Sequence, residues 1–182
     1  MIKTPLMRLQ IPSLLTRTNG KRTFMMLFCM SIFAVSMAQL KAKSKCPDFY
    51  VDILNGTVNG LKPNRAISEI KAEFPCATST EEDGTTAKCG SGVFYKDRDI
   101  YFFTHRQYIE IGPKFKGKLS IPMMGAKRNS LFSTLGNPKM KDDTWDAYEM
   151  QYGTLVLHYD AASKVKLIQF STQSTEVLSL CE

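Results

Sequence analysis

Hydrophobic and polar positions alternate with two different periods between residues 117 and 171. Leu131, Phe132 and Leu135 recur at the three-to-four spacing that places side chains on one face of a helix. The breakers Gly136-Asn137-Pro138 follow, so we expect the helix to end there. A short extended segment precedes the helix, and three strands follow it; we predict these segments at residues 118–121, 145–152, 154–159 and 164–170.

The first half of the chain shows the same pattern at a constant offset of 61 residues, which places Gly56 on Gly117, Ile70 on Leu131 and Phe74 on Leu135. The apolar positions predict a helix from about residue 65 to residue 73, which Pro75 ends. Three short alternating segments then predict strands at residues 92–96, 100–104 and 107–111.

A helix with one apolar stripe and a sheet with one apolar face must bury these surfaces against each other. The pattern therefore predicts an α+β fold, a disulfide-bonded tandem repeat of two helix-plus-antiparallel-sheet units. The units span residues 56–112 and 117–171, and segments 39–55 and 172–182 flank them. A unit of this size is near the lower limit for independent folding, so we expect the two to pack together.

The first 38 residues have the pattern of an export signal. Lys21-Arg22 precedes an apolar run at residues 24–35, which ends in Ser36-Met37-Ala38, with small residues where signal peptidase cuts. The run is shorter than the roughly 20 residues of a bilayer span. We predict cleavage near Ala38, no stable membrane span afterwards, and a periplasmic or secreted protein.

The net charge of +7 suggests a nucleic-acid partner until the charges are located. Five basic and no acidic residues precede Gln39, which leaves 19 basic against 17 acidic residues in the rest of the chain. A nearly neutral domain lacks the basic surface that binding to phosphates requires. We therefore expect no nucleic-acid partner.

Four cysteines remain after the predicted signal, an even number that predicts two disulfides in an exported chain: Cys46, Cys76, Cys89 and Cys181. Of the three possible pairings we favour Cys76 with Cys89, which closes a short polar loop, and Cys46 with Cys181, which ties the ends of the mature domain together. A thiolate metal site is the alternative, but the close Cys-x-x-Cys spacing does not occur.

Two clusters of charge could bind ions or partners. Four carboxylates lie close together in the sequence and could hold a hard cation: Asp142, Asp143, Asp146 and Glu149. They lack the spacing of a calcium loop, so we interpret them as a solvated loop balanced by Lys139 and Lys141, and we predict no metal and no cofactor. A basic patch could meet anionic lipid, glycan or an acidic protein face, or serve solubility: Lys114, Lys116, Lys118, Lys127 and Arg128.

The chain has two histidines, His105 and His158. His158 and Asp160 lie two apart on a predicted strand, hence on one face, where a carboxylate could orient an imidazole for hydrolysis. No nucleophile is specified beside them, so an ordinary polar strand end is the preferred interpretation. His105 falls in a predicted turn, where a solvated role is expected.

The predicted strands carry aromatic side chains on both faces, as Tyr95 and Tyr101 illustrate. One face suffices to cover the helices, so the other either forms a second core between the units or is an interface. Tyrosine and tryptophan are concentrated at interfaces because they add a large contact area at low entropic cost. The candidate binding residues are Tyr95, Tyr101, Phe103, Trp145, Tyr148 and Tyr159.

The second unit resembles a known superfamily in its helix from Ala126 to Phe132, the Leu135-Gly136-Asn137-Pro138 sequence, the aromatic Trp145 and Tyr148, and the closing strands. This pattern is similar to that of the β-lactamase-inhibitor-protein-like and SmpA/OmlA-like superfamily. The resemblance implies an exported α+β protein that binds proteins without catalysis. The chain lacks the lipidated cysteine of the lipoprotein branch, so we expect no lipid anchor.

These observations together predict an exported, non-enzymatic binding protein that docks a protein partner through an aromatic sheet face. A binder of small molecules or envelope glycans that uses the same aromatics is the first alternative. A hydrolase that uses His158 is the second alternative.

Overall fold

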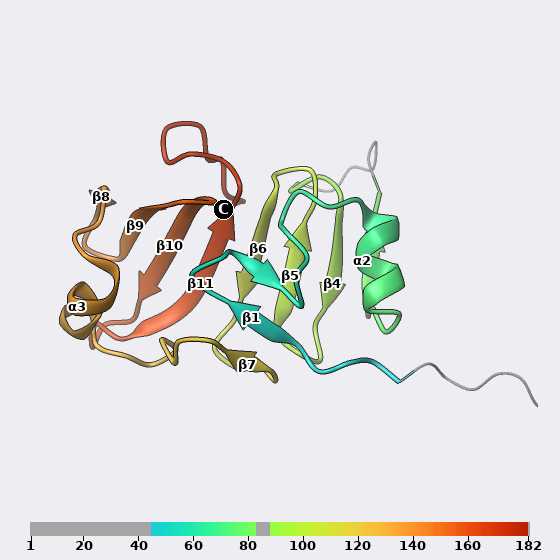
Figure 1. Cartoon of the computed structure of the whole chain (residues 1–182), viewed down its shortest axis with the longest axis horizontal. Helices are drawn as coiled ribbons and strands as arrows, with labels where there is room; N and C mark the ends of the chain where they lie inside the picture. Colours follow the sequence, from blue (N-terminus) through green and yellow to red (C-terminus); the bar gives the residue numbers. More distant parts are fainter. Residues whose placement is uncertain (1–44, 83–87, 182) are drawn as a thin grey trace, which may run out of the picture. The chain divides into compact units, whose positions relative to one another are not determined.

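The computed structural model describes residues 45–82 and 88–181, which belong to one compact unit. The predicted signal peptide lies outside the described residues. Among those residues, eight strands form one antiparallel sheet in the order β3-β4-β5-β6-β11-β10-β9-β8 (Figure 1). Their bounds are β3 Ser79–Glu81, β4 Gly92–Tyr95, β5 Ile100–Phe103, β6 Tyr108–Ile111, β8 Met140–Lys141, β9 Trp145–Met150, β10 Gly153–Tyr159 and β11 Val165–Ser171.

A small sheet lies over the large one, in the order β2-β1-β7. Its strands are β1 Tyr50–Asp52, β2 Thr57–Val58 and β7 Lys118–Leu119. β1 pairs antiparallel with β2 and parallel with β7, so the segment before the first predicted unit joins the segment that opens the second. Val51 and Val58 are fully buried, because both turn toward the large sheet.

Helix α2, Ile67–Glu73, packs on β4 and buries Ile70 together with the following Phe74. Glu69 caps its start, since the Ala66 backbone N–H donates to Glu69 Oε2 at 3.0 Å. The predicted helix is confirmed to within two residues, and Lys71 and Glu73 on its outer side are exposed.

The second predicted helix is shorter and begins as a 3₁₀ turn, η1 Arg128–Leu131, which continues into α3 Phe132–Leu135. Gly136 ends it with a φ of 76°, a backbone angle that glycine adopts without strain. Leu131 is buried and Leu135 packs against the core, but Phe132 is exposed because the 3₁₀ turn rotates the apolar stripe.

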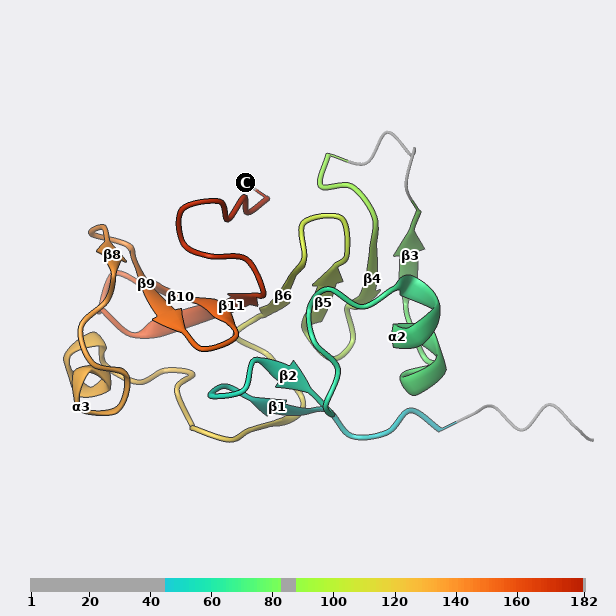
Figure 2. The same ribbon diagram turned by 45° about the horizontal axis from the view of Figure 1, so that its top comes forward.

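One face of the large sheet forms the core, and α2, the small sheet and α3 cover it from one end to the other (Figures 1 and 2). The alternation along each strand fixes which side chains point to this core face. They include Val93, Tyr95, Ile100, Phe102, Ile109, Ile111, Tyr148, Leu155, Leu157, Tyr159, Ile168 and Phe170.

The two predicted units share their order of elements, a short strand, a helix and four antiparallel strands, and β1 precedes the first unit. The last strands of the halves, β6 and β11, pair antiparallel from Ile111 opposite Ile168 to Tyr108 opposite Ser171. The described residues thus confirm a sheet-dominated α+β fold, whereas the tandem repeat stays a prediction. None of the described helices is long and apolar enough to cross a bilayer.

Two disulfides are present in the described residues, but the predicted pairing is wrong: Cys46 pairs with Cys76, and Cys89 with Cys181. Phe49 stacks on Phe74 with ring centroids 4.4 Å apart, which brings the segment before β1 to the end of α2. The C-terminal tail returns across the large sheet and reaches the loop before β4. Tertiary packing therefore decides the pairing, and the number of residues between the cysteines does not.

Candidate functional site

The large sheet has a second face, opposite the core face, that no described helix covers. Four aromatic side chains from three adjacent strands meet there, and we call them the aromatic strip: Phe94, Tyr101, Phe103 and Tyr108. The Phe103 and Tyr108 rings stack with centroids 4.5 Å apart, and Phe94 lies 5.3 Å from Phe103. Phe94 and Tyr108 are buried, whereas Tyr101 and Phe103 are partly exposed.

A polar row continues across the second face beside the strip, formed by His158, Gln169 and Glu110 from β10, β11 and β6. Gln169 Nε2 donates to Glu110 Oε2 at 2.8 Å, and Gln169 Oε1 lies 2.7 Å from His158 Nε2. Because the Gln169 amide group faces Glu110, its oxygen faces His158, so His158 Nε2 is the donor of that bond. Burial raises the pKa of Glu110, against the opposing effect of the Gln169 hydrogen bond.

The C-terminal tail, residues 172–181, crosses the second face and is held at several points (Figure 2). Thr154 Oγ1 donates to the Gln173 carbonyl at 2.8 Å, and Arg106 Nη1 donates to Ser179 Oγ at 2.7 Å. The Cys181 backbone N–H donates to the Tyr108 hydroxyl at 3.3 Å, next to the disulfide with Cys89. The tail is therefore a fixed part of this face.

A cavity of about 250 Å³ lies between the tail and strands β8 to β10; we call it the tail pocket. Mostly apolar side chains line it: Met140, Trp145, Ala147, Thr154, Val156, His158, Thr175, Leu178 and Leu180. Trp145 is the single tryptophan of the chain. The pocket can accept a small apolar group from solvent.

The structure divides the six predicted binding residues between the two faces. Tyr95, Tyr148 and Tyr159 are buried in the core, with exposed fractions of 0%, 1% and 2%. Tyr101 and Phe103 lie in the aromatic strip, and Trp145 lines the tail pocket. Three of the six are therefore core residues, because strand alternation sends neighbouring aromatics to opposite faces, and an interface role for the other three stays a prediction.

Sequence reasoning missed Glu110, Gln169 and the tail. Glu110 lies between Ile109 and Ile111, and this alternation indicates that its side chain points away from the core. The row that joins it to Gln169 depends on the pairing of β6 with β11, which joins strands 59 residues apart. The side chains alone do not indicate this long-range register.

The prediction that Asp146 belongs to a solvated loop is wrong, because it is fully buried. Strand alternation points it to the core face, where Tyr159 donates to it at 2.7 Å and Arg128 from η1 forms an ion pair with it. The side chain of Arg128 also lies over the Tyr159 ring, 4.9 Å from its centroid. Asp142 and Asp143 remain exposed.

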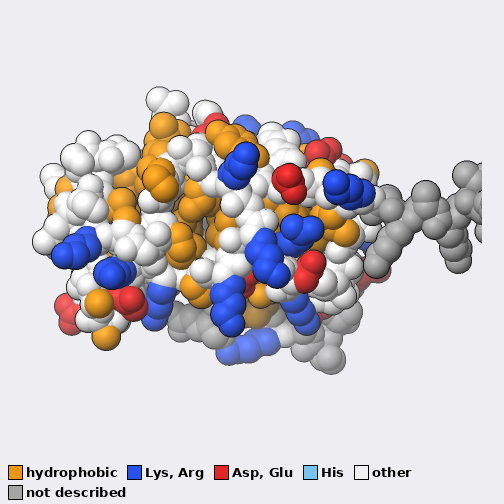
Figure 3. Space-filling view, turned by 90° about the horizontal axis from the view of Figure 1, so that it is seen from below, with side chains coloured by type: hydrophobic (Ala, Val, Ile, Leu, Met, Phe, Trp, Pro, Cys, Tyr) orange, Lys and Arg blue, Asp and Glu red, His pale blue; other side chains and the backbone are white. Residues whose placement is uncertain are grey.

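Arg128 of the basic patch is partly buried and paired with Asp146, whereas the four lysines of the patch are exposed: Lys114, Lys116, Lys118 and Lys127. Figure 3 shows lysine and arginine side chains beside hydrophobic ones on one face of the molecule. Within the described part of the chain, no three His, Cys, Asp or Glu side chains are arranged to hold a metal ion.

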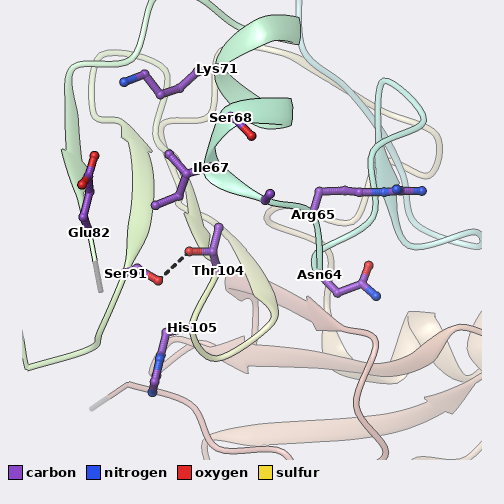
Figure 4. Close-up of a pocket in the computed structure, with 10 residues that line it drawn as sticks. Asn64, Arg65, Ile67, Ser68, Lys71, Glu82, Ser91, Thr104 and His105 are labelled. Carbon is purple, nitrogen blue, oxygen red and sulfur yellow. Dashed lines mark hydrogen bonds between the residues drawn. The ribbon is translucent and has the colours of Figure 1, made fainter. Parts of the chain in front are cut away.

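A second cavity, of about 890 Å³, lies beside the start of α2 (Figure 4). Ser91 Oγ, just before β4, and Thr104 Oγ1, just after β5, are hydrogen-bonded at 2.9 Å. His105 also lines the cavity, but Figure 4 shows its ring turned away from this hydroxyl pair. Its ring packs on Gly90, where a side chain would overlap it.

The fold and the second face are therefore the observations from which a function can be inferred. Comparisons of the chain with protein-family models, with curated proteins and with solved structures give no match.

Proposed function

We propose that this chain is an exported, non-enzymatic binding protein that docks a protein partner through the second face of its large sheet. The aromatic strip is the observation that carries the proposal. Both described helices lie on the core face, so Tyr101 and Phe103 remain partly exposed on a rigid sheet. Rigid aromatic side chains supply large contact area with little loss of entropy on binding.

Export to the periplasm or the cell exterior is part of this proposal. Disulfides form and persist in oxidising compartments, and the described chain contains two. They support the export signal predicted from residues 1–38.

The tandem repeat and the resemblance to the β-lactamase-inhibitor-protein-like and SmpA/OmlA-like superfamily belong to the same proposal. The shared order of elements in the two halves, with a helix before four antiparallel strands, supports a repeated unit. Joining the last strand of each unit makes one continuous sheet, whose second face is long enough to contact a protein surface.

Two alternatives make different use of the second face. A binder of small molecules or envelope glycans would use the tail pocket, which is smaller than most ligand sites. A hydrolase would need His158 beside a Ser, Thr or Cys nucleophile, whereas its Nε2 is engaged by Gln169. The geometry favours a binding surface.

Site-specific photo-cross-linking in the native host tests the docking face. A photoreactive phenylalanine at position 101 or 103 is expected to capture the same protein, which mass spectrometry then identifies. Position 50 is the matched control, because Tyr50 is an exposed aromatic of the small sheet, with 48% of its surface accessible. Equal capture of the same protein from position 50, or no specific product from 101 and 103, would contradict the proposal.

A further inference from the structure

We propose that the tail pocket receives a tyrosine side chain of the protein partner, as a neutral aromatic ring that carries one hydroxyl. This inference rests on the proposed docking function and identifies the anchor that the partner uses. Interfaces commonly concentrate their binding energy in a few aromatic side chains that fill preformed pockets.

The size of the pocket suits one ring. Its volume is about 250 Å³, whereas an apolar cavity of about 150 Å³ holds benzene. The pocket therefore has room for a phenol ring together with its connecting methylene. Met140 at the wall is 48% exposed, so the pocket opens to solvent and a partner side chain can enter.

The lining selects against charge. The described lining residues include no Asp, Glu, Lys or Arg. A charged side chain would lose its hydration there without gaining an opposite charge, which is strongly unfavourable. Trp145, Val156 and Leu178 instead offer apolar surface to a ring.

Two polar groups in the walls indicate the hydroxyl. Thr175 Oγ1 is buried, and no hydrogen bond of standard geometry joins it to another described residue. The Thr175 hydroxyl does help to lower the pKa of the Glu176 carboxyl, but it is the smallest of several causes, and the Ser174 side chain is the largest. A phenol hydroxyl could satisfy Thr175 Oγ1. His158 donates from Nε2 to Gln169, so in its neutral form Nδ1 is an acceptor.

The pocket is continuous with the docking face. His158 lines the pocket and is hydrogen-bonded to Gln169, which is hydrogen-bonded to Glu110. Glu110 lies directly opposite Tyr101 in the pairing of β5 with β6. A partner that lies on the aromatic strip is therefore positioned to place one side chain in the pocket.

Trp145 allows a direct test, because it is the single tryptophan of the chain and lies in the pocket wall, so tryptophan fluorescence reports on the pocket. The purified wild-type protein is titrated with p-cresol, which is the tyrosine side chain as a free molecule, and with toluene, which lacks the hydroxyl. Excitation is set to the red edge of tryptophan absorption. We expect a saturable change with p-cresol and binding about fivefold weaker with toluene, as loss of one hydrogen bond predicts.

Two variants and one control locate the binding. Val156→Phe fills the pocket and should abolish saturable binding while melting stays cooperative. Thr175→Val should weaken p-cresol about fivefold and leave toluene unchanged, and this milder change serves if Val156→Phe fails to fold. Tyr50→Ser, at an exposed aromatic of the small sheet outside the pocket and the second face, should leave p-cresol binding as in the wild type.

The outcomes separate this inference from the docking proposal. Absence of saturable p-cresol binding to the wild type, or binding that Thr175→Val and Val156→Phe leave unchanged, overturns the inference even if positions 101 and 103 cross-link a partner. Saturating p-cresol should also reduce that cross-linking. If the cross-linking stays unchanged, the pocket binds a free phenol, and the proposal that it receives a tyrosine of the partner is wrong. If neither position 101 nor position 103 cross-links a partner, the proposed docking function is overturned instead.

Discussion

Arg128 donates two hydrogen bonds to the buried carboxylate of Asp146: Nε lies 3.0 Å from one oxygen and Nη2 lies 2.5 Å from the other. This bidentate pair fastens the start of η1 to β9 across the core face. Arg128 Nη2 also donates to the Asp142 carbonyl at 2.8 Å, so the same guanidinium holds the loop before β9.

Removing Arg128 should strongly destabilise the fold, because Asp146 would then be a buried charge without its counterion. For Arg128→Met we expect the free energy of unfolding to fall by about 3 kcal/mol or more, measured by urea denaturation near neutral pH. The double variant Arg128→Met with Asp146→Leu should recover most of the loss. Lys139→Met is the control, since it breaks only exposed ion pairs, with Glu149 and Glu176, and should change stability little. An Arg128 variant as stable as the Lys139 variant would refute this role.

Gly56 lies against the Tyr152 ring, and a Cβ at Gly56 would overlap that ring. Its φ of 60° also disfavours any other residue. Gly56→Ala should therefore lower the free energy of unfolding by more than the roughly 1 kcal/mol expected from backbone strain alone. Gly60→Ala is the matched control: its φ is 84° but nothing lies within 4 Å of the added Cβ. Equal losses in the two variants would show that the contact with Tyr152 is unimportant.

The disulfide pairing can be read from peptides of the non-reduced protein. Trypsin cuts after Lys88 and so separates Cys76 from Cys89. We expect the peptide that begins at Cys46 to be joined to the one with Cys76, and the C-terminal peptide to the one with Cys89. A link between the peptides of Cys76 and Cys89 would contradict the structure.

The two disulfides should differ in their contribution to stability. Replacing both cysteines of a pair by serine should destabilise by about 4 kcal/mol for Cys46–Cys76 and about 5 kcal/mol for Cys89–Cys181, because the closed loops differ in length. The separations are 30 and 92 residues. Chemical denaturation of the two double variants under oxidising conditions provides the comparison.

Glu110 should make stability fall as the pH rises. Burial raises its pKa above the ordinary value of 4.5, so between the two values the folded state binds more protons than the unfolded state. Glu110→Gln removes this titration and still accepts the hydrogen bond from Gln169. The variant should therefore gain stability relative to the wild type as the pH rises from below the ordinary pKa of 4.5 towards neutrality. Urea midpoints of both proteins across that range test this, with the exposed Glu149→Gln as control; a constant difference would contradict it.

Local periodicity predicted the elements that carry their own signal. The α2 helix and strands β4, β5 and β6 were found within two residues of the predicted ends, because Ile70, Phe74 and the alternating Ile and Phe residues define both period and face. The sequence pattern did not predict β3, because Ser79, Thr80 and Glu81 form a strand only through backbone pairing with β4. β8 was missed for the same reason.

The candidate site was only half predictable. Alternation placed Tyr101 and Phe103 on the same face of one strand, but it could not say which face of the sheet the helices cover. Pairing of β6 with β11, and the return of the tail to Cys89, depend on contacts between distant segments. Those contacts create both the polar row and the tail pocket.

The order of the large sheet leaves two very short strands, β3 and β8, at its ends in the described structure. Each carries a charged residue, Glu81 or Lys141, and few backbone groups are left open for another chain to extend the sheet. Short, charged strands at both ends of the sheet therefore disfavour edge-to-edge pairing between copies of this chain.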